Sequence, residues 1–223
     1  EVECALRYGK LFAARLHAAG KRDITPPESG EWKVDVLEKG RLDQFVAQPV
    51  EHKPLEETHV RIEVRAAGMN FRDVLNVLGM VPVPWLGLEL AGVVTEVGSA
   101  VTDLEVGERV FGMGHATFAT SAVADRTLLI KIPELMTFEE ASTIPLTFLT
   151  AWYALKDLGK IQAGERILIH AAAGGVGMAA LQLCQLHGLE VFGTASEPKW
   201  DMLRRLGLDD DHIGSSRDIS FAQ

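Results

Sequence analysis

The sequence has few cysteines and no excess of basic residues. Only two of its 223 residues are cysteines, Cys4 and Cys184, which lie far apart and form no C-x-x-C pair. This usage provides neither a disulfide framework nor the ligand spacing of a zinc site, and it favours a reducing, cytoplasmic environment. The 22 Lys and Arg residues are outnumbered by 31 Asp and Glu residues, which gives a formal net charge of -9. This balance argues against nonspecific binding to nucleic acid or to an anionic membrane surface.

Long hydrophobic runs are missing as well. No stretch reaches the about 20 apolar residues that a membrane-spanning helix needs, and the first residues lack the pattern of a secretion signal. Because 47% of the residues are hydrophobic, the chain can nevertheless bury a substantial core. We therefore expect a water-soluble globular protein of one or two domains.

The first part of the chain changes pattern near residue 30. Residues 1–30 contain one strand-like run, LFAARL, followed by KRDITPPESG, whose prolines and glycine are typical of a linker. From Trp32 to about Pro133 the chain consists of short β-prone runs separated by glycine, proline and acidic turns. These runs are WKVDVL, HVRIEVRAAG, LELAGVVTEV, ERVFGM, TFATSAVA and LLIKIP. They predict an antiparallel β-rich module, interrupted by one helix, NFRDVLNVLG, that ends near Gly79.

From Thr137 onward the hydrophobic period lengthens from two residues to about 3.6. Thr137 and Glu140 form a T-x-x-E capping box, and TFLTAWYALKDLG follows as a helix that ends at Gly159. Strands are predicted over 166–170, over 190–194 and near Ile213, with helices over 176–187 and 198–206 between them. This alternation indicates βαβ units on a parallel sheet.

A glycine-rich turn connects the first of these strands to its helix. In RILIHAAAGGVGM, Ala172, Gly174 and Gly177 occupy the three glycine positions of G-x-G-x-x-G, and Gly175 adds a further glycine. Such a turn leaves backbone N–H groups unpaired at the helix N-terminus, where the helix dipole also favours negative charge. The pattern indicates a diphosphate-binding site; the alternative is a tight strand-to-helix turn without a ligand.

The end of the second strand indicates which dinucleotide fits. NAD-specific sites place a carboxylate about 20 residues after the glycines, where it binds the ribose 2′-hydroxyl. Here that place reads TASEPKW, in which Thr194, Ala195 and Ser196 carry no charge and Lys199 offers a cation to a 2′-phosphate. The sequence therefore favours NADPH. Glu197 is the competing carboxylate, and we interpret it as a first-turn helix acid rather than a ribose contact.

Several segments together resemble the medium-chain dehydrogenase/reductase superfamily. They are VRAAGMNFRDVLNVLGM, LGLELAGVVTEVGSAVTDLEVGERVFG, ASTIPLTFLTAWYAL, IHAAAGGVGMAALQL, TASEPKW and LGLDDDHIGSSRDISF. Within the superfamily the chain looks most like the enoylreductase domain of modular polyketide synthases, and it is similar also to the enoylreductase of animal fatty acid synthase. The likeness covers nearly everything from Trp32 to Gln223.

The resemblance implies an α/β fold in three parts. Residues 1–30 would form an interdomain linker, residues 31–136 a β-rich GroES-like substrate-binding domain, and residues 137–223 the first part of a Rossmann-type NADPH-binding domain with a parallel sheet. The likeness is to the zinc-free branch, because GMNFRD and GLELAG stand where zinc alcohol dehydrogenases are expected to carry their ligands. We therefore expect hydride transfer without a metal.

The resemblance also implies an activity. NADPH would deliver hydride to the β-carbon of an α,β-unsaturated acyl thioester held by an acyl carrier protein. The resulting enolate needs hydrogen-bond donors and then a proton, whose donor the sequence does not assign. Neighbouring synthase domains are implied as further partners, and the parent synthase could be a homodimer. Carried over position by position, the cofactor-binding residues are Asn70, Thr150, Gly174, Gly175, Val176, Gly177, Thr194, Ser196, Lys199 and Arg217.

Four of these polar residues also have a simpler interpretation. Asn70 could cap the helix that starts beside it, and one residue can serve both purposes. Thr150 could donate to a carbonyl one turn back in its helix. Lys199 and Arg217 could be solvated surface cations.

Two departures from the family pattern matter. Many members carry a tyrosine where this chain has Val81, in LGMVPV, and that tyrosine is associated with the stereochemical outcome at a methyl-bearing α-carbon of the substrate. We therefore expect Val81, as a substrate-binding residue, to make this domain behave like the class that lacks the tyrosine.

Family members also continue beyond the point that corresponds to Gln223, through a G-K-x-D segment with the proposed proton donors. We expect the 223-residue chain alone to be aggregation-prone and catalytically weak, because its parallel sheet would expose an apolar edge.

Two other functions remain open at this point. A stand-alone NADPH-dependent quinone or enone reductase would share the N-F-x-D and A-x-x-G-G-V-G elements. A non-catalytic, nucleotide-binding fragment of a synthase is the third possibility.

Overall fold

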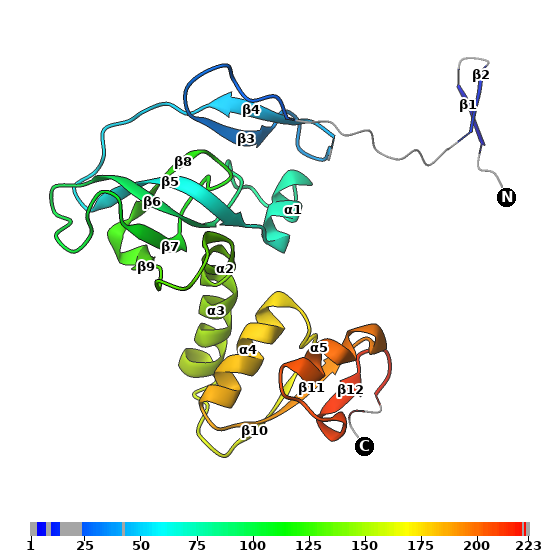
Figure 1. The fold of residues 1–223 in the computed structure, drawn as a ribbon. Helices are drawn as coiled ribbons and strands as arrows, with labels where there is room; N and C mark the ends of the chain where they lie inside the picture. Colours follow the sequence, from blue (N-terminus) through cyan, green and yellow to red (C-terminus); the bar gives the residue numbers. More distant parts are fainter. Residues whose placement is uncertain (1–3, 8–9, 14–23, 42, 220, 222–223) are drawn as a thin grey trace.

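The computed structural model describes residues 4–7, 10–13, 24–41, 43–219 and 221. Its first unit is built on a five-stranded antiparallel sheet with the order β8-β5-β6-β7-β9 (Figure 1). These strands are β5 (His59–Gly68), β6 (Glu89–Val97), β7 (Arg109–Met113), β8 (Ser121–Asp125) and β9 (Leu129–Lys131). The predicted antiparallel β-rich module is confirmed.

Both faces of this sheet are covered. Val60 and Ile62 on β5, together with Leu90 on β6, are fully buried in one cluster. The next residue of β6, Ala91, points to the other face and packs against Phe111 in a second cluster. The sheet is therefore a rigid base for the residues at the ends of β5 and β6.

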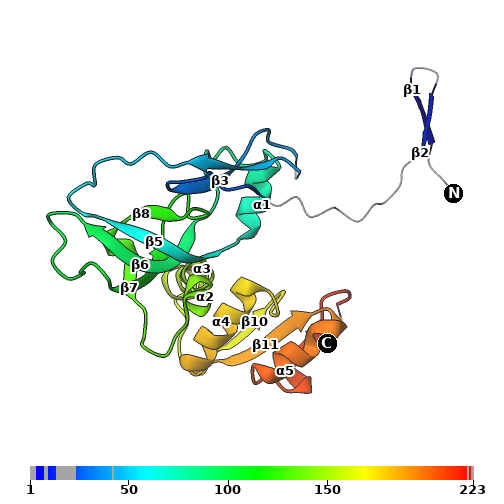
Figure 2. The same ribbon diagram turned by 45° about the horizontal axis from the view of Figure 1, so that its top comes forward.

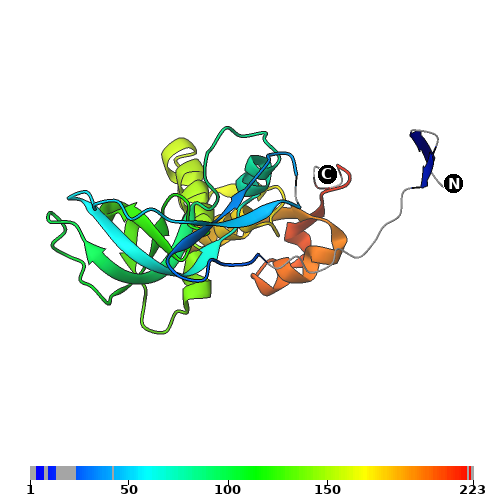
Figure 3. The same ribbon diagram turned by 90° about the horizontal axis from the view of Figure 1, so that it is seen from above.

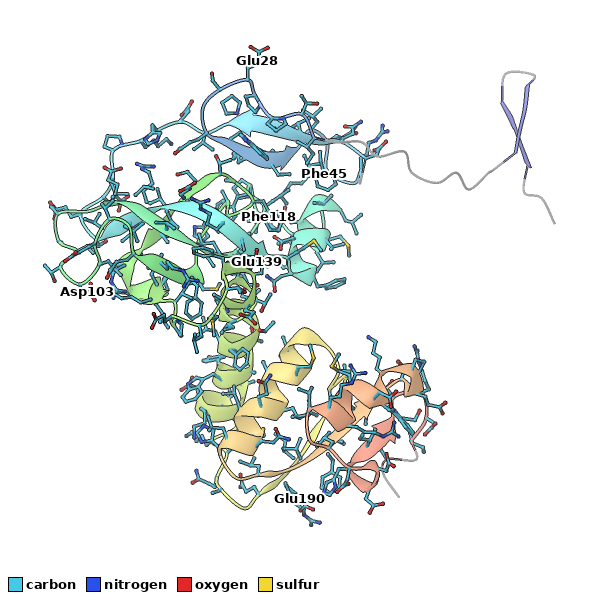
Figure 4. The ribbon with its side chains drawn as sticks, viewed as in Figure 1. Glu28, Phe45, Asp103, Phe118, Glu139 and Glu190 are labelled. Atoms are coloured by element: carbon cyan, nitrogen blue, oxygen red, sulfur yellow. The ribbon has the colours of Figure 1, made fainter. Side chains whose placement is uncertain are left out.

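A hairpin lies beside the sheet. It consists of β3 (Trp32–Val36) and β4 (Phe45–Pro49). The backbone N–H of Val34 donates to the carbonyl of Phe118 at 2.7 Å, and Figure 4 shows Phe118 between the hairpin and the sheet. A separate antiparallel pair, β1 (Cys4–Arg7) and β2 (Lys10–Ala13), falls within the predicted linker. Residues 14–23 of that linker lie outside the described residues.

Helix α1 (Phe71–Val77) leads out of β5. Leu78 caps it, and Gly79 follows with a φ of +75°, a left-handed conformation that glycine adopts without steric cost. The predicted helix and its stop at Gly79 are confirmed.

Two helices connect the first unit to the second, as Figures 1 and 2 show. The predicted capping box at the start of α2 (Phe138–Ser142) is present, because Glu140 N–H donates to Thr137 Oγ1 at 3.1 Å and Thr137 N–H donates to Glu140 Oε2 at 2.9 Å. Helix α3 (Pro145–Trp152) continues as a π-helical segment over Tyr153–Leu158 and ends at Gly159. Helix α2 packs on the five-stranded sheet and α3 packs on α4, so the domain division at residue 136 stays a prediction.

The second unit is a parallel sheet with the order β10-β11-β12. The strands are β10 (Arg166–Ile169), β11 (Glu190–Ala195) and β12 (Ile213–Ser215). Helix α4 (Gly175–Leu186) connects β10 to β11, and α5 (Trp200–Arg205), preceded by a 3₁₀ turn over Glu197–Lys199, connects β11 to β12. The predicted βαβ alternation and parallel sheet are confirmed, and Figure 3 shows this unit from above.

Helices cover one face of the parallel sheet. Ile169 and Val191 from the strands are buried with Leu181 of α4 and Leu203 of α5 in one core cluster. Leu168 points the other way and is 41% exposed. The carboxyl ends of the three strands meet at one edge, since β10, β11 and β12 run in the same direction. In parallel α/β sheets this is the edge at which ligands bind.

Candidate functional site

A cleft of about 340 Å³ lies where the two units meet. Its walls come from the end of β5, the start of β6, helix α3 and the first turns of α4. The residues that line it include Asn70, Glu89, Thr147, Phe148, Gly175 and Gln182. Two predicted cofactor contacts far apart in sequence, Asn70 and Gly175, therefore share one cleft. A larger cavity of about 670 Å³ lies between the β3–β4 hairpin and the sheet, away from these residues.

Asn70 stands at the junction of β5 and α1 and is held from two sides. Its backbone N–H donates to Asp73 Oδ2 at 2.8 Å, which is half of a capping box, and it is the N-cap residue of α1 as the simpler interpretation expects. Its side-chain Nδ2 donates to Glu89 Oε1 at 2.7 Å. Both carboxylates are almost fully buried, at 5% and 2% exposure. Asn70 is thus the N-cap residue of α1 by position, but its side chain makes no capping hydrogen bond and lines the cleft instead.

The glycine turn leads into α4, and no side chain of the N-cap residue binds the first N–H groups of this helix. Ala171 adopts a left-handed φ of +51°, and Gly174 N–H donates back to the Ala171 carbonyl at 2.8 Å. Gly174 is the N-cap, and within residues 43–219 no side chain caps this helix start. The N–H groups of the first turn, from Gly175 to Gly177, lack carbonyl partners within the helix. Together with the helix dipole they form a place suited to an anion.

Gly177 is the position in this turn that cannot carry a side chain. A Cβ there would lie 2.7 Å from Ala172 Cα and 2.9 Å from its carbonyl carbon, and it would also collide with the carbonyl oxygen of Ala171. At Gly175 the nearest atom would be Thr147 Cγ2 at 3.2 Å, which is only a tight contact. Close packing of α4 against the turn therefore depends on Gly177, and Gly175 is the more open of the two.

The resemblance implies four residues around the 2′-phosphate, and three of them follow strands at the carboxyl edge of the sheet: Ser196, Lys199 and Arg217. Ser196 follows β11 directly, and Lys199 lies in the 3₁₀ turn after it. Arg217 follows β12, which is tied to β11 by Ser216 N–H donating to the Ala195 carbonyl at 3.0 Å. Lys199 and Arg217 are exposed, and the Arg217 backbone N–H donates to Ser215 Oγ at 3.1 Å. Two cations are thus available at this edge.

Thr194 is placed differently from its predicted neighbours. It is 1% exposed, and its hydroxyl lies 3.0 Å from Nδ1 of His170, the residue that follows β10. The ring of His170 also makes an edge contact with Phe221, at 5.3 Å between centroids. His170 stands at the mouth of the glycine turn, and sequence reasoning did not select it because a lone histidine after a strand gives no signal.

Thr150 donates its hydroxyl to the Leu146 carbonyl at 2.6 Å, the bond to a carbonyl one turn back that the sequence allowed. Thr147, one turn earlier on α3, lines the cleft beside Asn70 and Gly175, whereas Thr150 does not. The hydroxyl of Thr147 donates to the Thr143 carbonyl at 3.0 Å. Sequence reasoning missed Thr147, although the two threonines lie three residues apart on one helix and therefore on neighbouring positions of its surface.

Val81 lies in the loop between α1 and β6 and is partly buried. Lys39 fastens this loop, because its Nζ donates to the Val83 carbonyl and to Asn76 Oδ1, each at 2.7 Å. Val81 does not line the cleft that holds Asn70 and Gly175. Its predicted influence on product stereochemistry stays a prediction.

The remaining candidates for chemistry are few. Among the described residues, no group of three or more His, Cys, Asp or Glu side chains could hold a metal ion. Cys184 lies on the buried face of α4, and burial raises the pKa of its thiol above the usual value. None of the helices in the described ranges is long and apolar enough to span a bilayer.

Comparisons with known proteins agree with this fold. Residues 56–134 match the family described as "Alcohol dehydrogenase GroES-like domain". The polyketide synthase GfsB of Streptomyces halstedii is 53% identical over 199 residues, which is 88% of this chain and 4% of that protein. The crystal structure of CurK enoyl reductase superposes with a TM-score of 0.82 at 41% identity, covering 87% of this chain and 62% of that one. A quinone oxidoreductase from Pseudomonas syringae pv. Tomato superposes with a TM-score of 0.71 at 33% identity, covering 79% of this chain and 57% of the other.

These findings define the class of protein first: a GroES-like sheet joined to a Rossmann-type parallel sheet makes the chain a member of the medium-chain dehydrogenase/reductase superfamily. Within that superfamily it belongs with the enoylreductase domains of modular polyketide synthases. It spans 4% to 14% of the length of the curated relatives and 62% of the CurK enoyl reductase chain.

Proposed function

We propose that the cleft binds NADPH and that the chain takes part in reducing an α,β-unsaturated acyl thioester on an acyl carrier protein. The observation that carries the proposal is the shared cleft: Asn70 and the open first turn of α4 line one cavity. A nicotinamide ring beside Asn70 and a diphosphate at Gly175 would then belong to one extended ligand. The kinship with polyketide synthases and enoyl reductases supports the same interpretation.

The residues present fit the phosphorylated cofactor. The N–H groups from Gly174 to Gly177 would hold the diphosphate. The side chains that would face the 2′-phosphate are those of Ser196, Lys199 and Arg217. Thr194 would position His170 at the same edge of the sheet. When bound, NADPH supplies the hydride for the β-carbon. Asn70 and Thr147 line the cleft, and Thr150 follows one turn later on α3. These three residues would orient the nicotinamide end and exclude water from it.

The proposed partners follow from the relatives. Because these are polyketide synthases, we propose that neighbouring synthase domains and an acyl carrier protein deliver the substrate, in the cytoplasm and within a parent synthase that could be a homodimer. We further propose that Val81 gives the product of a methyl-branched substrate the configuration of the tyrosine-lacking class. Chiral analysis of that product checks this, and the tyrosine-class configuration would refute it.

A second function has one observation in its favour. The superposition on a quinone oxidoreductase extends over most of this chain, so a protein with that name has the same fold in this region. Side-by-side rates with NADPH on crotonyl thioester and on a quinone separate the two functions in the full-length protein. Faster thioester reduction supports the first, and faster quinone reduction supports the second. Cofactor binding with neither activity would leave a non-catalytic nucleotide-binding role.

A further inference from the structure

Glu89 is a buried acid that the proposed function does not use. It is the first residue of β6 and is 2% exposed, yet its side chain lines the cleft between the two units. Each carboxylate oxygen accepts one hydrogen bond: Oε1 from Asn70 Nδ2 at 2.7 Å, and Oε2 from the backbone N–H of Leu146 at 2.8 Å. A carboxylate in such a place is costly unless its oxygens are paired, and here both are.

The two donors belong to different parts of the molecule. Asn70 precedes α1 in the first unit, whereas Leu146 lies in the first turn of α3, which leads into the second unit. The N-cap of α3 is Ile144, which has no side-chain oxygen, and Pro145 follows it. Glu89 supplies the acceptor and the negative charge that this helix start lacks. It therefore fixes α3 relative to Asn70 across the cleft.

The bond to Asn70 also decides which way the carboxamide faces. A carboxylate only accepts hydrogen bonds, so Asn70 must turn its NH₂ group toward Glu89 and leave its oxygen on the other side. The main chain of Asn70 cannot adjust, because Asp73 binds its N–H and in turn accepts from Gly87 N–H at 2.9 Å. The Glu89 carboxylate also packs directly against Gly68, because a Cβ at residue 68 would collide with it.

We propose that Glu89 is a positioning residue: it locks the Asn70 carboxamide so that the cleft is offered a hydrogen-bond acceptor rather than a donor. This inference rests on the proposed function, in which the ligand group beside Asn70 is a nicotinamide. The carboxamide of that ring carries an NH₂ group that such an acceptor selects. Asn70 would be the contact, and Glu89 would act only through it.

An exchange of amide and acid between the two positions tests this inference. In Glu89→Gln, the new side chain keeps an oxygen for Leu146 N–H and turns its NH₂ to Asn70, which must flip and present NH₂ to the cleft. Asn70→Asp sets two carboxylates against each other. In the double variant N70D/E89Q, the introduced glutamine donates to one oxygen of the introduced aspartate, and the other oxygen of that aspartate again faces the cleft as an acceptor.

The measurement is the Kd of NADPH from fluorescence titration of the full-length protein, with melting temperatures recorded for each variant. We expect each single substitution to raise the Kd about tenfold or more, and the double variant to return to within about threefold of wild type, since the two sites are in contact and non-additive. Glu105→Gln, which removes an exposed charge from the same unit, is the matched control and should leave the Kd unchanged.

The outcomes are distinct. If wild type binds NADPH and Glu89→Gln binds it equally well, the inference about Glu89 is wrong and the proposed function stands. If the double variant is as impaired as the single variants while melting normally, Glu89 has a structural role only, and the inference fails. If wild type binds no NADPH, both the proposed function and the inference fail.

Discussion

The hydroxyl of Thr194 lies 3.0 Å from Nδ1 of His170, across the carboxyl ends of the neighbouring strands β11 and β10. Thr194 is 1% exposed, so this bond fixes the His170 ring from below at the mouth of the glycine turn. The pair joins the turn proposed for the diphosphate to the strand end proposed for the 2′-phosphate. Thr194, which was predicted as a cofactor contact, therefore positions the His170 ring.

Thr194→Val should separate these two roles. Valine keeps the buried shape but removes the hydroxyl, so we expect the free energy of unfolding to fall by about 1 kcal/mol, the net worth of one hydrogen bond. The Kd of NADPH should change less than in Lys199→Ala. Chemical denaturation and cofactor titration measure the two quantities. A loss of NADPH affinity larger than that of Lys199→Ala would mean that Thr194 contacts the cofactor itself.

Lys199→Ala should weaken NADPH while leaving NADH unaffected. The exposed ammonium after β11 would lose its bond to a doubly charged phosphate, and a charge-assisted hydrogen bond of about 1.5 to 3 kcal/mol corresponds to a Kd about ten- to hundredfold higher. Competition titrations with both nucleotides measure this difference. Arg205→Ala, which removes an exposed cation at the end of α5, is the matched control. Equal losses in the two variants would indicate a general charge effect instead of a phosphate contact.

Gly177→Ala should disrupt the turn, whereas Gly175→Ala should leave the stability of the fold nearly unchanged. The new Cβ at 177 would meet backbone atoms of Ala172 within 3 Å, and overpacking of this kind costs about 1 to 3 kcal/mol. At 175 the methyl group meets only Thr147 Cγ2, and alanine is the better helix former. Melting temperature and NADPH affinity should both fall for the first variant. Equal falls in melting temperature for the two variants would contradict the proposed packing of the turn.

The stability of the edge strand β12 should decrease as the pH rises. Asp209 first, and then Glu190, raise the pKa of His212 above its ordinary value by hydrogen bonding to its ring, at 2.6 and 3.2 Å. Figure 4 shows Glu190 at the far end of this unit, and its strand begins there, opposite the proposed site. Because the folded-state pKa is raised, the protonated ring stabilises the fold below the unfolded pKa, about 6.5, and this contribution is lost as the pH rises through the folded pKa.

Hydrogen exchange of residues 209–215, corrected for the intrinsic rate, measures this effect in the full-length protein. Protection should be higher at about pH 6 than at about pH 8 in the wild type. His212→Gln should show no such dependence. A wild-type protection factor that stays constant over this range would show that the ring is not held in its charged form by Asp209.

Local signals in the sequence predicted much of the fold. The β-prone runs, the capping box at Thr137 and the glycine turn all depend on neighbours a few residues away, and the structure has them. Strand β4 escaped prediction because its run, FVAQP, is short, carries a glutamine and ends in proline; only its pairing with β3 makes it a strand.

The site was less accessible to sequence reasoning where it depends on distant contacts. Glu89 stands in an apolar run, and its partner Leu146 lies 57 residues further along the chain, so no local pattern indicates the bond. His170 and Thr147 are missed for the same reason: their neighbours in the cleft and at the sheet edge come from other elements. Asn70 was predicted as a cofactor contact because the family resemblance implies it; the sequence alone shows only its place beside a helix start.

The central claim is that the cleft between Asn70 and the first turn of α4 holds the phosphorylated nicotinamide cofactor. Calorimetric titration of the full-length protein with NADPH and then with NADH tests it most directly. We predict one site per chain, which binds NADPH at least about tenfold more tightly than NADH. The Gly177→Ala substitution should weaken the binding of NADPH to this site. No heat of binding with NADPH, or equal affinity for the two nucleotides, would contradict the account.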